Sequence, residues 1–241
     1  MARKGRSNHL ALLSSPVAWN LPRKGRMWAQ KPVPGPHGLE DSIPLTVLLR
    51  DVLKYVESAH EAKKVLQKGL LVDGRKITDL RFPIGLMDVL SIPSEGKSYR
   101  ILIDSKGRLM PVEISEKDAK VKLCKVKKKV TIAGKKIQIG LHDGRTFLGD
   151  NHYKVGDSVK FDLHAKKVSE KLELKNGARC LVTQGRHAGK VAKLEEIIER
   201  AGSMDAQVRM KSKHAEFTTL KNYVFVIDDS IKEHESKEEG K

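Results

Sequence analysis

Short hydrophobic segments separated by glycine-containing turns fill most of this chain after residue 97. Alternating segments cover 99–103 and 109–114, with Ser105-Lys-Gly-Arg108 between them, and another covers 158–163. Alternation with a period of two is typical of strands with one buried face, and such turns join neighbouring strands. The region 97–172 is therefore predicted to be a β domain, a small barrel or sandwich.

The same pattern continues over residues 173–230, which we expect to form a separate small barrel. Its predicted strands cover 178–183, 190–198, 206–210, 217–219 and 224–227. The last residues, 231–241, are rich in acidic side chains and have almost no apolar ones. This composition predicts a disordered tail.

Residues 41–96 carry the helical signals of the chain. Apolar residues at helical spacing predict a first helix: Leu45, Leu48, Leu49, Val52, Leu53 and Val56. A second helix is expected after Ser58, which forms a capping-box pattern with Glu61, and it ends at Gly69. Asp73-Gly74 then predicts a hairpin turn. Two short helices on a small sheet make a compact module.

The first 40 residues differ from the rest because cations precede any acidic residue. Three prolines and two glycines between residues 32 and 38 disfavour a helix or a central strand. Trp19 and Trp28 lie inside this segment. They could dock on the protein's own body, or the segment could be an arm that orders against RNA. We favour the arm.

The charge of the chain narrows its possible partners. Lys and Arg number 47 against 30 Asp and Glu, a formal net charge of +17. Such an excess favours binding to a polyanion. Apolar runs of only four or five residues argue against a membrane, and the start of the chain does not resemble a signal peptide. Nucleic acid is the predicted partner.

Two cysteines, Cys124 and Cys180, lie 56 residues apart and form no CxxC pair. They are interpreted as reduced thiols in a cytoplasmic protein, not as a disulfide or a zinc site. The nine histidines are scattered without ligand spacing. No metal, cofactor or small-molecule substrate is predicted.

Residues 47–92 resemble the alpha-L RNA-binding module of ribosomal proteins and RNA-modifying enzymes. The matching segments are Val47-Leu-Leu-Arg50, Ala62-Lys63, Lys68-Gly69 and Val72-Asp-Gly-Arg75. The resemblance implies a helix pair that presents cations to folded RNA. His60 stands where the module usually has Arg, and Met87-Asp88 replaces its usual Gly-Asp.

A second motif, Asn176–Val191, resembles the KOW motif of ribosomal proteins and transcription factors. Gly185 and Gly189 allow tight backbone turns, and Arg186, His187 and Lys190 are candidate phosphate contacts. The segment is not a phosphate-binding loop of the Walker type. Three residues separate its glycines instead of four, and Val191 replaces the Ser or Thr that would hold magnesium.

The order of these segments resembles one family, the archaeal and eukaryotic small-subunit ribosomal proteins numbered four with the suffix e. Matching phrases include Gly35-Pro-His-Gly38, Pro83–Val89, Lys122–Val126, His142–Thr146, Gly202–Asp205 and Asn222–Ile227. The chain ends without the longer basic extension of eukaryotic members, so the archaeal form is expected. The resemblance implies a scaffold on ribosomal RNA in the cytoplasmic small subunit, beside neighbouring ribosomal proteins, without catalysis.

The predicted fold class is α+β, mostly β. It comprises a basic N-terminal arm (1–40), an alpha-L RNA-binding module (41–96), a central β domain (97–172), a C-terminal SH3-like KOW barrel (173–230) and the disordered tail (231–241). The predicted RNA-binding residues are Arg3, Lys4, Arg6, Arg23, Lys24, Arg26, Arg50, Lys54, His60, Lys63, Lys64, Lys68, Arg75, Lys76, Arg186, His187 and Lys190.

Two other functions remain as alternatives. One is a free RNA-binding regulator or modification accessory that visits RNA transiently, and the weaker one is an enzyme with a degenerate site. Pseudouridine synthases also carry the alpha-L module, followed by a Gly-Arg-Leu-Asp motif. Here Met110 follows Gly107-Arg-Leu109, and methionine cannot serve as the nucleophilic carboxylate.

Overall fold

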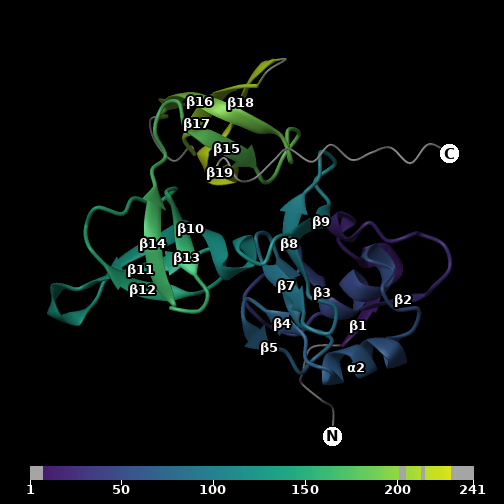
Figure 1. Ribbon diagram of the computed structural model, residues 1–241. Coiled ribbons are helices and arrows are strands. Elements are labelled where there is room, and N and C mark those ends of the chain that lie inside the picture. The colour runs from purple at the N-terminus through teal and green to yellow at the C-terminus, as the bar shows by residue number, and fades with distance from the viewer. Residues whose placement is uncertain (1–7, 201–204, 213–214, 229–241) are drawn as a thin grey trace, which may run out of the picture. The chain divides into compact units, whose positions relative to one another are not determined.

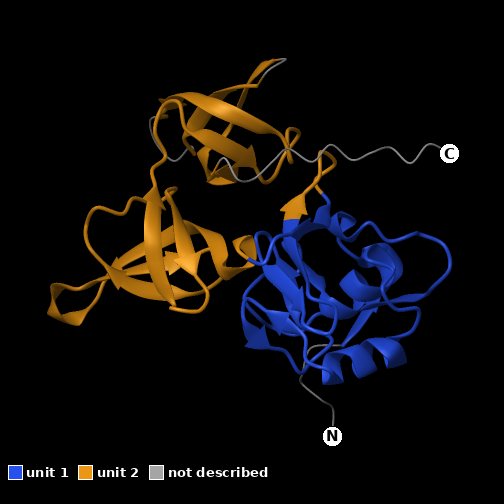
Figure 2. Ribbon diagram, viewed as in Figure 1, with its two compact units in different colours: residues 1–101, 108–116 blue, residues 102–107, 117–241 orange. Residues whose placement is uncertain are grey.

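The computed structural model describes residues 8–200, 205–212 and 215–228 of the chain (Figure 1). The predicted tail and the cations at positions 3, 4 and 6 lie outside these ranges. The chain divides into two units (Figure 2). Unit 1 comprises residues 1–101 and 108–116, and unit 2 comprises residues 102–107 and 117–241.

The main sheet of unit 1 has five strands in the order β5-β4-β7-β8-β9. They are β4 (Leu71–Val72), β5 (Arg75–Lys76), β7 (Val89–Ile92), β8 (Lys97–Ile103) and β9 (Leu109–Ile114). Leu90 pairs with Tyr99 in the antiparallel register of β7 and β8. Backbone pairing between β7 and β8 therefore continues across the domain boundary expected after residue 96. The sequence pattern changes from helical to alternating near residue 97, and this change does not show which strands pair.

The N-terminal segment is ordered on unit 1. It contains β1 (His9–Ala11), η1 (Leu12–Ser14), η2 (Val17–Trp19) and β2 (Trp28–Gln30), and β1 pairs with β2. The Trp19 side chain is fully buried, and its Nε1 donates a hydrogen bond to the Ser42 carbonyl oxygen. For Trp19, the docking that we had disfavoured is what the structure shows. Burial of a large aromatic ring outweighs the cost of ordering this segment.

A buried pair fastens the glycine-rich end of this segment to unit 1. His37 Nε2 lies 3.0 Å from a carboxylate oxygen of Asp88, and both side chains are almost inaccessible to solvent. The same carboxylate accepts a hydrogen bond from the Gly85 amide at 2.8 Å. A Cβ on Gly85 would lie 2.4 Å from the His37 ring, so the ring packs where only glycine leaves room. Gly85 ends β6 (Pro83–Gly85), which pairs with β3 (Ser42–Pro44).

The first helix is shorter than its apolar pattern predicts. It runs as α1 (Leu45–Val47) and continues as a π-helical turn, η3 (Leu48–Val52). The Leu53 amide donates to the Leu48 carbonyl oxygen, and Lys54 then adopts a left-handed conformation with φ 52°. The backbone therefore leaves the helix before Lys54, so Arg50 and Lys54 are not neighbours on one helical face as expected.

The second helix follows its sequence signals closely. It is α2 (Ala59–Gln67), with Ser58 as N-cap accepting a hydrogen bond from the Glu61 amide. The Glu61 carboxylate accepts one in turn from the Glu57 amide, and these bonds lower the pKa of Glu61. Gly69 follows with φ 101°, a conformation that favours glycine. The capping-box prediction is confirmed.

Two left-handed positions shape the hairpin region of unit 1. Asp73 and Gly74 both have positive φ, as the predicted two-residue turn requires. Met87 is also left-handed, with φ 65°, although it is fully buried. Glycine, the usual residue there in the alpha-L module, adopts this conformation without strain. The departure from the module's pattern therefore leaves the backbone conformation in place and adds a core side chain.

Unit 2 contains two five-stranded antiparallel sheets. The first has the order β12-β11-β10-β13-β14, with β10 (Val121–Thr131), β11 (Ile137–Leu141), β12 (Thr146–Gly149), β13 (Ser158–Asp162) and β14 (Lys167–Leu172). The second has the order β18-β17-β16-β15-β19, with β15 (Arg179–Val182), β16 (Val191–Ile198), β17 (Gln207–Lys211), β18 (Glu216–Leu220) and β19 (Val224–Val226). The mostly β fold class is confirmed.

Each of these sheets has its own buried side chains. In the second sheet, Cys180 packs with apolar residues of all the central strands, among them Val208 and Met210. Cys124 is buried on β10, and the two cysteines do not form a disulfide with each other. The described part of unit 2 also contains three short 3-10 helices: η4 (Asp118–Lys120), η5 (Ala133–Lys135) and η6 (Lys221–Tyr223).

Candidate nucleic-acid interface

Helix α2 presents a row of cations to solvent. Ala62 and Leu66 are buried in unit 1 and Val65 is partly buried, whereas the other residues of the helix are exposed. The exposed basic side chains on and just after it are His60, Lys63, Lys64 and Lys68. Arg75 and Lys76 are also exposed, on the edge strand β5. We name the lysines Lys63, Lys64 and Lys68 the α2 lysines.

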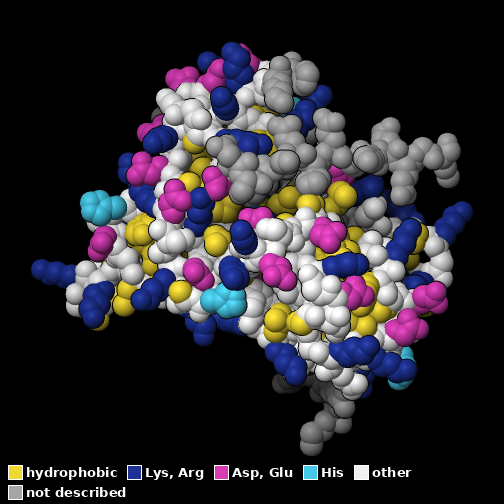
Figure 3. Space-filling model, in the orientation of Figure 1, with side chains coloured by type: hydrophobic (Ala, Val, Ile, Leu, Met, Phe, Trp, Pro, Cys, Tyr) yellow, Lys and Arg dark blue, Asp and Glu magenta, His cyan; other side chains and the backbone are white. Residues whose placement is uncertain are grey.

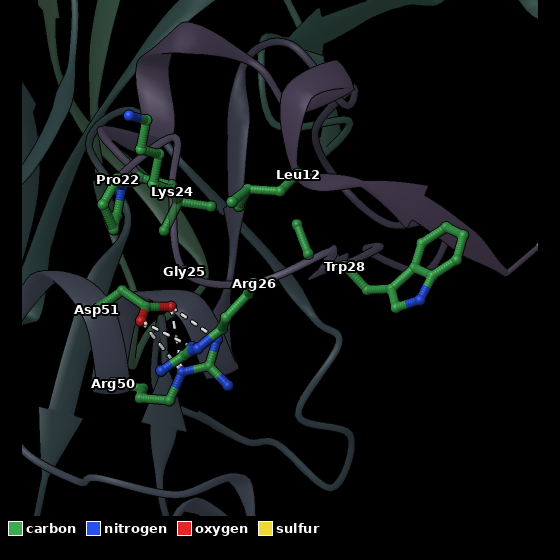
Figure 4. A pocket seen from close by; sticks show the side chains of 10 residues that line it. Leu12, Pro22, Lys24, Gly25, Arg26, Trp28, Arg50 and Asp51 are labelled. Carbon is green, nitrogen blue, oxygen red and sulfur yellow. Dashed lines mark hydrogen bonds and ion pairs between the residues drawn. The ribbon is translucent and has the colours of Figure 1, made fainter.

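Arg50 does not belong to that row. Its guanidinium is held by Asp51, with Nη2 2.8 Å from the carboxylate, and Arg26 Nη1 reaches the same carboxylate at 3.1 Å. Figure 4 shows the two guanidinium groups converging on Asp51. Asp51 thus links Arg26 of the predicted arm to Arg50 of the predicted module. These three side chains line a cavity of unit 1 together with Lys24. Arg23 and Lys54 are exposed.

In the KOW-like segment, the two glycines expected at tight turns are both left-handed. Gly185 has φ 87° and Gly189 has φ 78°, and Arg186 and Lys190 are exposed between and beside them. His187 instead stacks on Phe217, with ring centroids 4.3 Å apart. Partial burial, together with the nearby Lys190 and Arg186, lowers the pKa of His187. A neutral ring stacked on the protein contributes little to charge-based phosphate binding at neutral pH.

A further cationic surface was not among the predicted site residues. The hairpin formed by β10 and β11 carries exposed lysines at its strands and tip: Lys127, Lys128, Lys135 and Lys136. Lys129 is partly buried, and its ammonium contacts the Asn151 backbone carbonyl oxygen at 2.9 Å. The sequence did contain a signal, since residues 119–142 include eight lysines and no acidic residue. We name the four exposed lysines the hairpin lysines.

Acidic side chains are interspersed with the cations over the visible surface. Figure 3 shows Lys and Arg over all regions of this face, with Asp and Glu among them. Several lysines are neutralised within the fold, for example Lys160, whose ammonium lies 2.7 Å from both Glu170 and Asp228. The pKa of Lys160 is raised by hydrogen bonds to these two carboxylates. Lysines held by carboxylates in this way contribute little to the net positive charge, which comes from the cations that have no carboxylate beside them.

One buried polar cluster lies within the first sheet of unit 2. The Lys122 ammonium is 3.1 Å from the Asp143 carboxylate, and both side chains are inaccessible to solvent. Arg145 Nε lies 3.2 Å from the same carboxylate. Burial acts to raise the pKa of Asp143, but the charges of Lys122 and His142 and its hydrogen bonds outweigh burial and lower it.

Asp143 also groups with Cys124 and His142, whose ligand-type atoms lie within 4.8 Å of one another. Such a triad could in principle hold a metal ion, contrary to the scattered spacing of the histidines in the sequence. Here, however, the carboxylate faces the ammonium of Lys122 and the guanidinium of Arg145. A metal cation would have to displace or approach these charges. The chemistry of this cluster is that of a buried ion pair.

Comparison with known proteins agrees with this architecture. The family model "Ribosomal family S4e" matches residues 95–168, and the "RS4NT (NUC023) domain" matches residues 4–40. The chain is 42% identical to "Small ribosomal subunit protein eS4" of Methanothermobacter thermautotrophicus, covering 96% of this chain and 97% of the relative. The protein of that name from Methanosphaera stadtmanae is 41% identical, with 94% and 95% covered.

A solved structure is similar as well. The crystal structure of the 30S ribosomal protein S4e from Thermoplasma acidophilum aligns with a TM-score of 0.68 at 33% identity, covering 78% of this chain and 95% of that chain. The fold and its sequence relatives define the class as ribosomal proteins. Within that class, the chain belongs to the S4e family, as its sequence phrases predicted. Among the described residues, no helix has the length and apolar character needed to cross a membrane.

Proposed function

We propose that this protein is a structural constituent of the small ribosomal subunit that binds ribosomal RNA and supports subunit assembly and translation in the cytoplasm. The observation that carries the proposal is the set of exposed cations on separate folded platforms in a chain of net charge +17. They are the α2 lysines with Arg75 and Lys76, the hairpin lysines, and Arg186 with Lys190. Near-full-length relatives named as small-subunit proteins support the same partner.

Binding by such surfaces depends mainly on phosphate neutralisation. Each lysine or arginine that meets a phosphate releases condensed counterions, and this release favours the complex. Bases in A-form helices are poorly accessible to side chains, so the spacing of the platforms selects RNA by shape. The N-terminal segment, the alpha-L-like module and the KOW-like barrel would each meet a different stretch of RNA, with other ribosomal proteins as neighbours.

The role that we propose does not include catalysis. Cys124 and Cys180 are the nucleophiles with the strongest intrinsic reactivity in the chain, and both are buried. Burial raises the pKa of Cys180 to about 12, so its thiolate is scarce at neutral pH. Met110 stands at the position where pseudouridine synthases have their nucleophilic carboxylate, and methionine cannot serve as that nucleophile. A scaffold role requires none of these groups.

The salt dependence of RNA binding tests the proposal. We expect the full chain to bind small-subunit ribosomal RNA transcribed in vitro, with the logarithm of the association constant falling linearly against the logarithm of salt concentration. With on the order of ten neutralised phosphates, the slope is steep and binding weakens by several powers of ten from low to moderate salt. Filter binding or fluorescence anisotropy measures the slope. A shallow slope of about one or two would contradict binding through several cationic platforms.

A further inference from the structure

The two tryptophans of the N-terminal segment have opposite environments. Trp19 is fully buried, whereas Trp28 is 54% exposed. Trp28 lies on β2, where Ala29 faces the core, so strand alternation directs the indole to solvent. His9 on the paired strand β1 lies beside it, with ring centroids 5.2 Å apart. Half of a large aromatic surface therefore stays available at a place where the backbone is held by strand pairing.

A cavity of about 260 Å³ lies next to Trp28 in unit 1. Its wall combines apolar groups, such as Leu12 and Pro22, with three cationic side chains: Lys24, Arg26 and Arg50. Figure 4 shows the Trp28 indole directed away from Asp51, at which the guanidinium groups of Arg26 and Arg50 gather. One aromatic residue and three cationic residues thus line one small cavity.

The charge of the cavity suits an anion. Among its lining residues Asp51 is the one acidic side chain, and it contacts both Arg26 and Arg50. One carboxylate cannot neutralise two guanidinium groups and an ammonium, so the wall keeps a net positive charge. Asp51 also fixes the direction of the two guanidinium groups, which reduces the entropy that they lose when they bind a phosphate. Arg26 remains half exposed and can donate outward.

We propose that this cavity binds one unpaired nucleotide of ribosomal RNA, its base stacked on Trp28 and its phosphate held by Lys24 and Arg26. The inference rests on the proposed function and names the RNA element that this site accepts. Bases inside a duplex are already stacked on their neighbours, so an exposed indole gains most from a base in a loop or bulge. Every base has a π face, so the site is tolerant of base identity.

Affinity measurements on Trp28 variants of the full chain test the inference. Stacking of one base is lost in Trp28→Leu, so we expect binding to small-subunit ribosomal RNA to weaken about 5- to 150-fold. The slope against salt should stay at the wild-type value, because stacking releases no counterions. Trp28→Phe keeps an aromatic face and should retain most of the affinity. Val17→Ala, which shortens a side chain that is 75% exposed outside the cavity lining, should bind as wild type.

Tryptophan fluorescence provides a second readout. Binding of RNA should quench the exposed Trp28, whereas Trp28→Phe, which retains only the buried Trp19, should show little quenching. Wild-type affinity in Trp28→Leu, equal quenching in Trp28→Phe, or a loss of affinity that tracks a lowered unfolding midpoint would each overturn the nucleotide site. If wild type does not bind the RNA, the proposed function fails along with it. If the wild-type protein binds the RNA and Trp28→Leu binds it with the same affinity, only the nucleotide-site proposal is contradicted.

Discussion

Replacing Asp143 with alanine is expected to lower the unfolding free energy of the first sheet in unit 2 by about 3–5 kcal/mol. The Lys122 ammonium is fully buried and lies 3.1 Å from this carboxylate. Removing the carboxylate takes away the 3.1 Å ion pair of a buried positive charge, or forces Lys122 to give up its proton. Either outcome is costly, since water cannot replace the lost contact without opening the sheet.

Amide hydrogen exchange can measure this effect where it arises. Both tryptophans lie in unit 1, so their fluorescence does not report on unit 2. We expect faster exchange in β10, β11 and β13, and unchanged exchange in β4 and β7 of unit 1. Asp150→Ala removes an exposed carboxylate of the same unit and should change stability by less than about 0.5 kcal/mol. Equal exchange in wild type and Asp143→Ala would contradict the account of the pair.

A double replacement separates two contributions to the free energy of unfolding: the penalty of leaving one charge unpaired and the stabilisation given by the ion pair itself. Lys122→Met with Asp143→Leu removes both charges and should restore most of the stability lost in Asp143→Ala. Arg145 keeps a second contact in that variant, since its guanidinium lies over the Phe161 ring.

The dependence on pH follows from the direction of the Asp143 shift. Its pKa is lower in the folded protein than in the unfolded chain, so its contribution is complete above the unfolded value. The contribution is lost as pH falls through the folded pKa. The difference between wild type and Asp143→Ala should therefore shrink in acid below about pH 4.

Simultaneous replacement of the α2 lysines by alanine should weaken binding to small-subunit ribosomal RNA by roughly two orders of magnitude at about 0.1 M salt. All three side chains are exposed, so the helix should fold as before, and alanine favours it. The slope of the logarithm of affinity against that of salt should fall by about three, one for each lost phosphate contact.

A matched triple variant distinguishes a local contact from a change of net charge. Lys166, Lys167 and Lys175 are exposed in unit 2 and lie outside the surfaces described above. Replacing these three by alanine removes the same formal charge but should leave the slope near the wild-type value. Equal slopes for the two triple variants would show that α2 does not face RNA and that only the overall charge matters.

Local signals predicted local structure well in this chain. The capping box at Ser58, the turn at Asp73-Gly74 and the glycine turns at Gly185 and Gly189 depend on a few neighbouring residues, and all form as expected. Periodicity also located the strands of the second unit 2 sheet. The end of the helix starting at Leu45 was not predicted correctly. It depends on a π-type turn and a left-handed Lys54, which the spacing of apolar residues does not encode.

Tertiary contacts account for what the sequence did not predict. Trp19 is buried because the distant Ser42 offers an acceptor, and β8 joins the sheet of unit 1 because β7 has a free edge. Arg26 and Arg50 meet through Asp51, although 24 positions separate them in the chain. The hairpin lysines are different. The sequence already shows that residues 119–142 contain no acidic residue, and the structure adds that these lysines lie on an exposed hairpin.

Sedimentation of a cell extract tests the central claim most directly, namely that the cationic platforms of this protein hold it on small-subunit RNA. In a sucrose gradient at moderate salt, the native protein should migrate with the small ribosomal subunit in near-stoichiometric amount. A washed subunit preparation that lacks the protein, with the chain recovered at the top of the gradient, would contradict a structural role and favour a transient visitor to RNA.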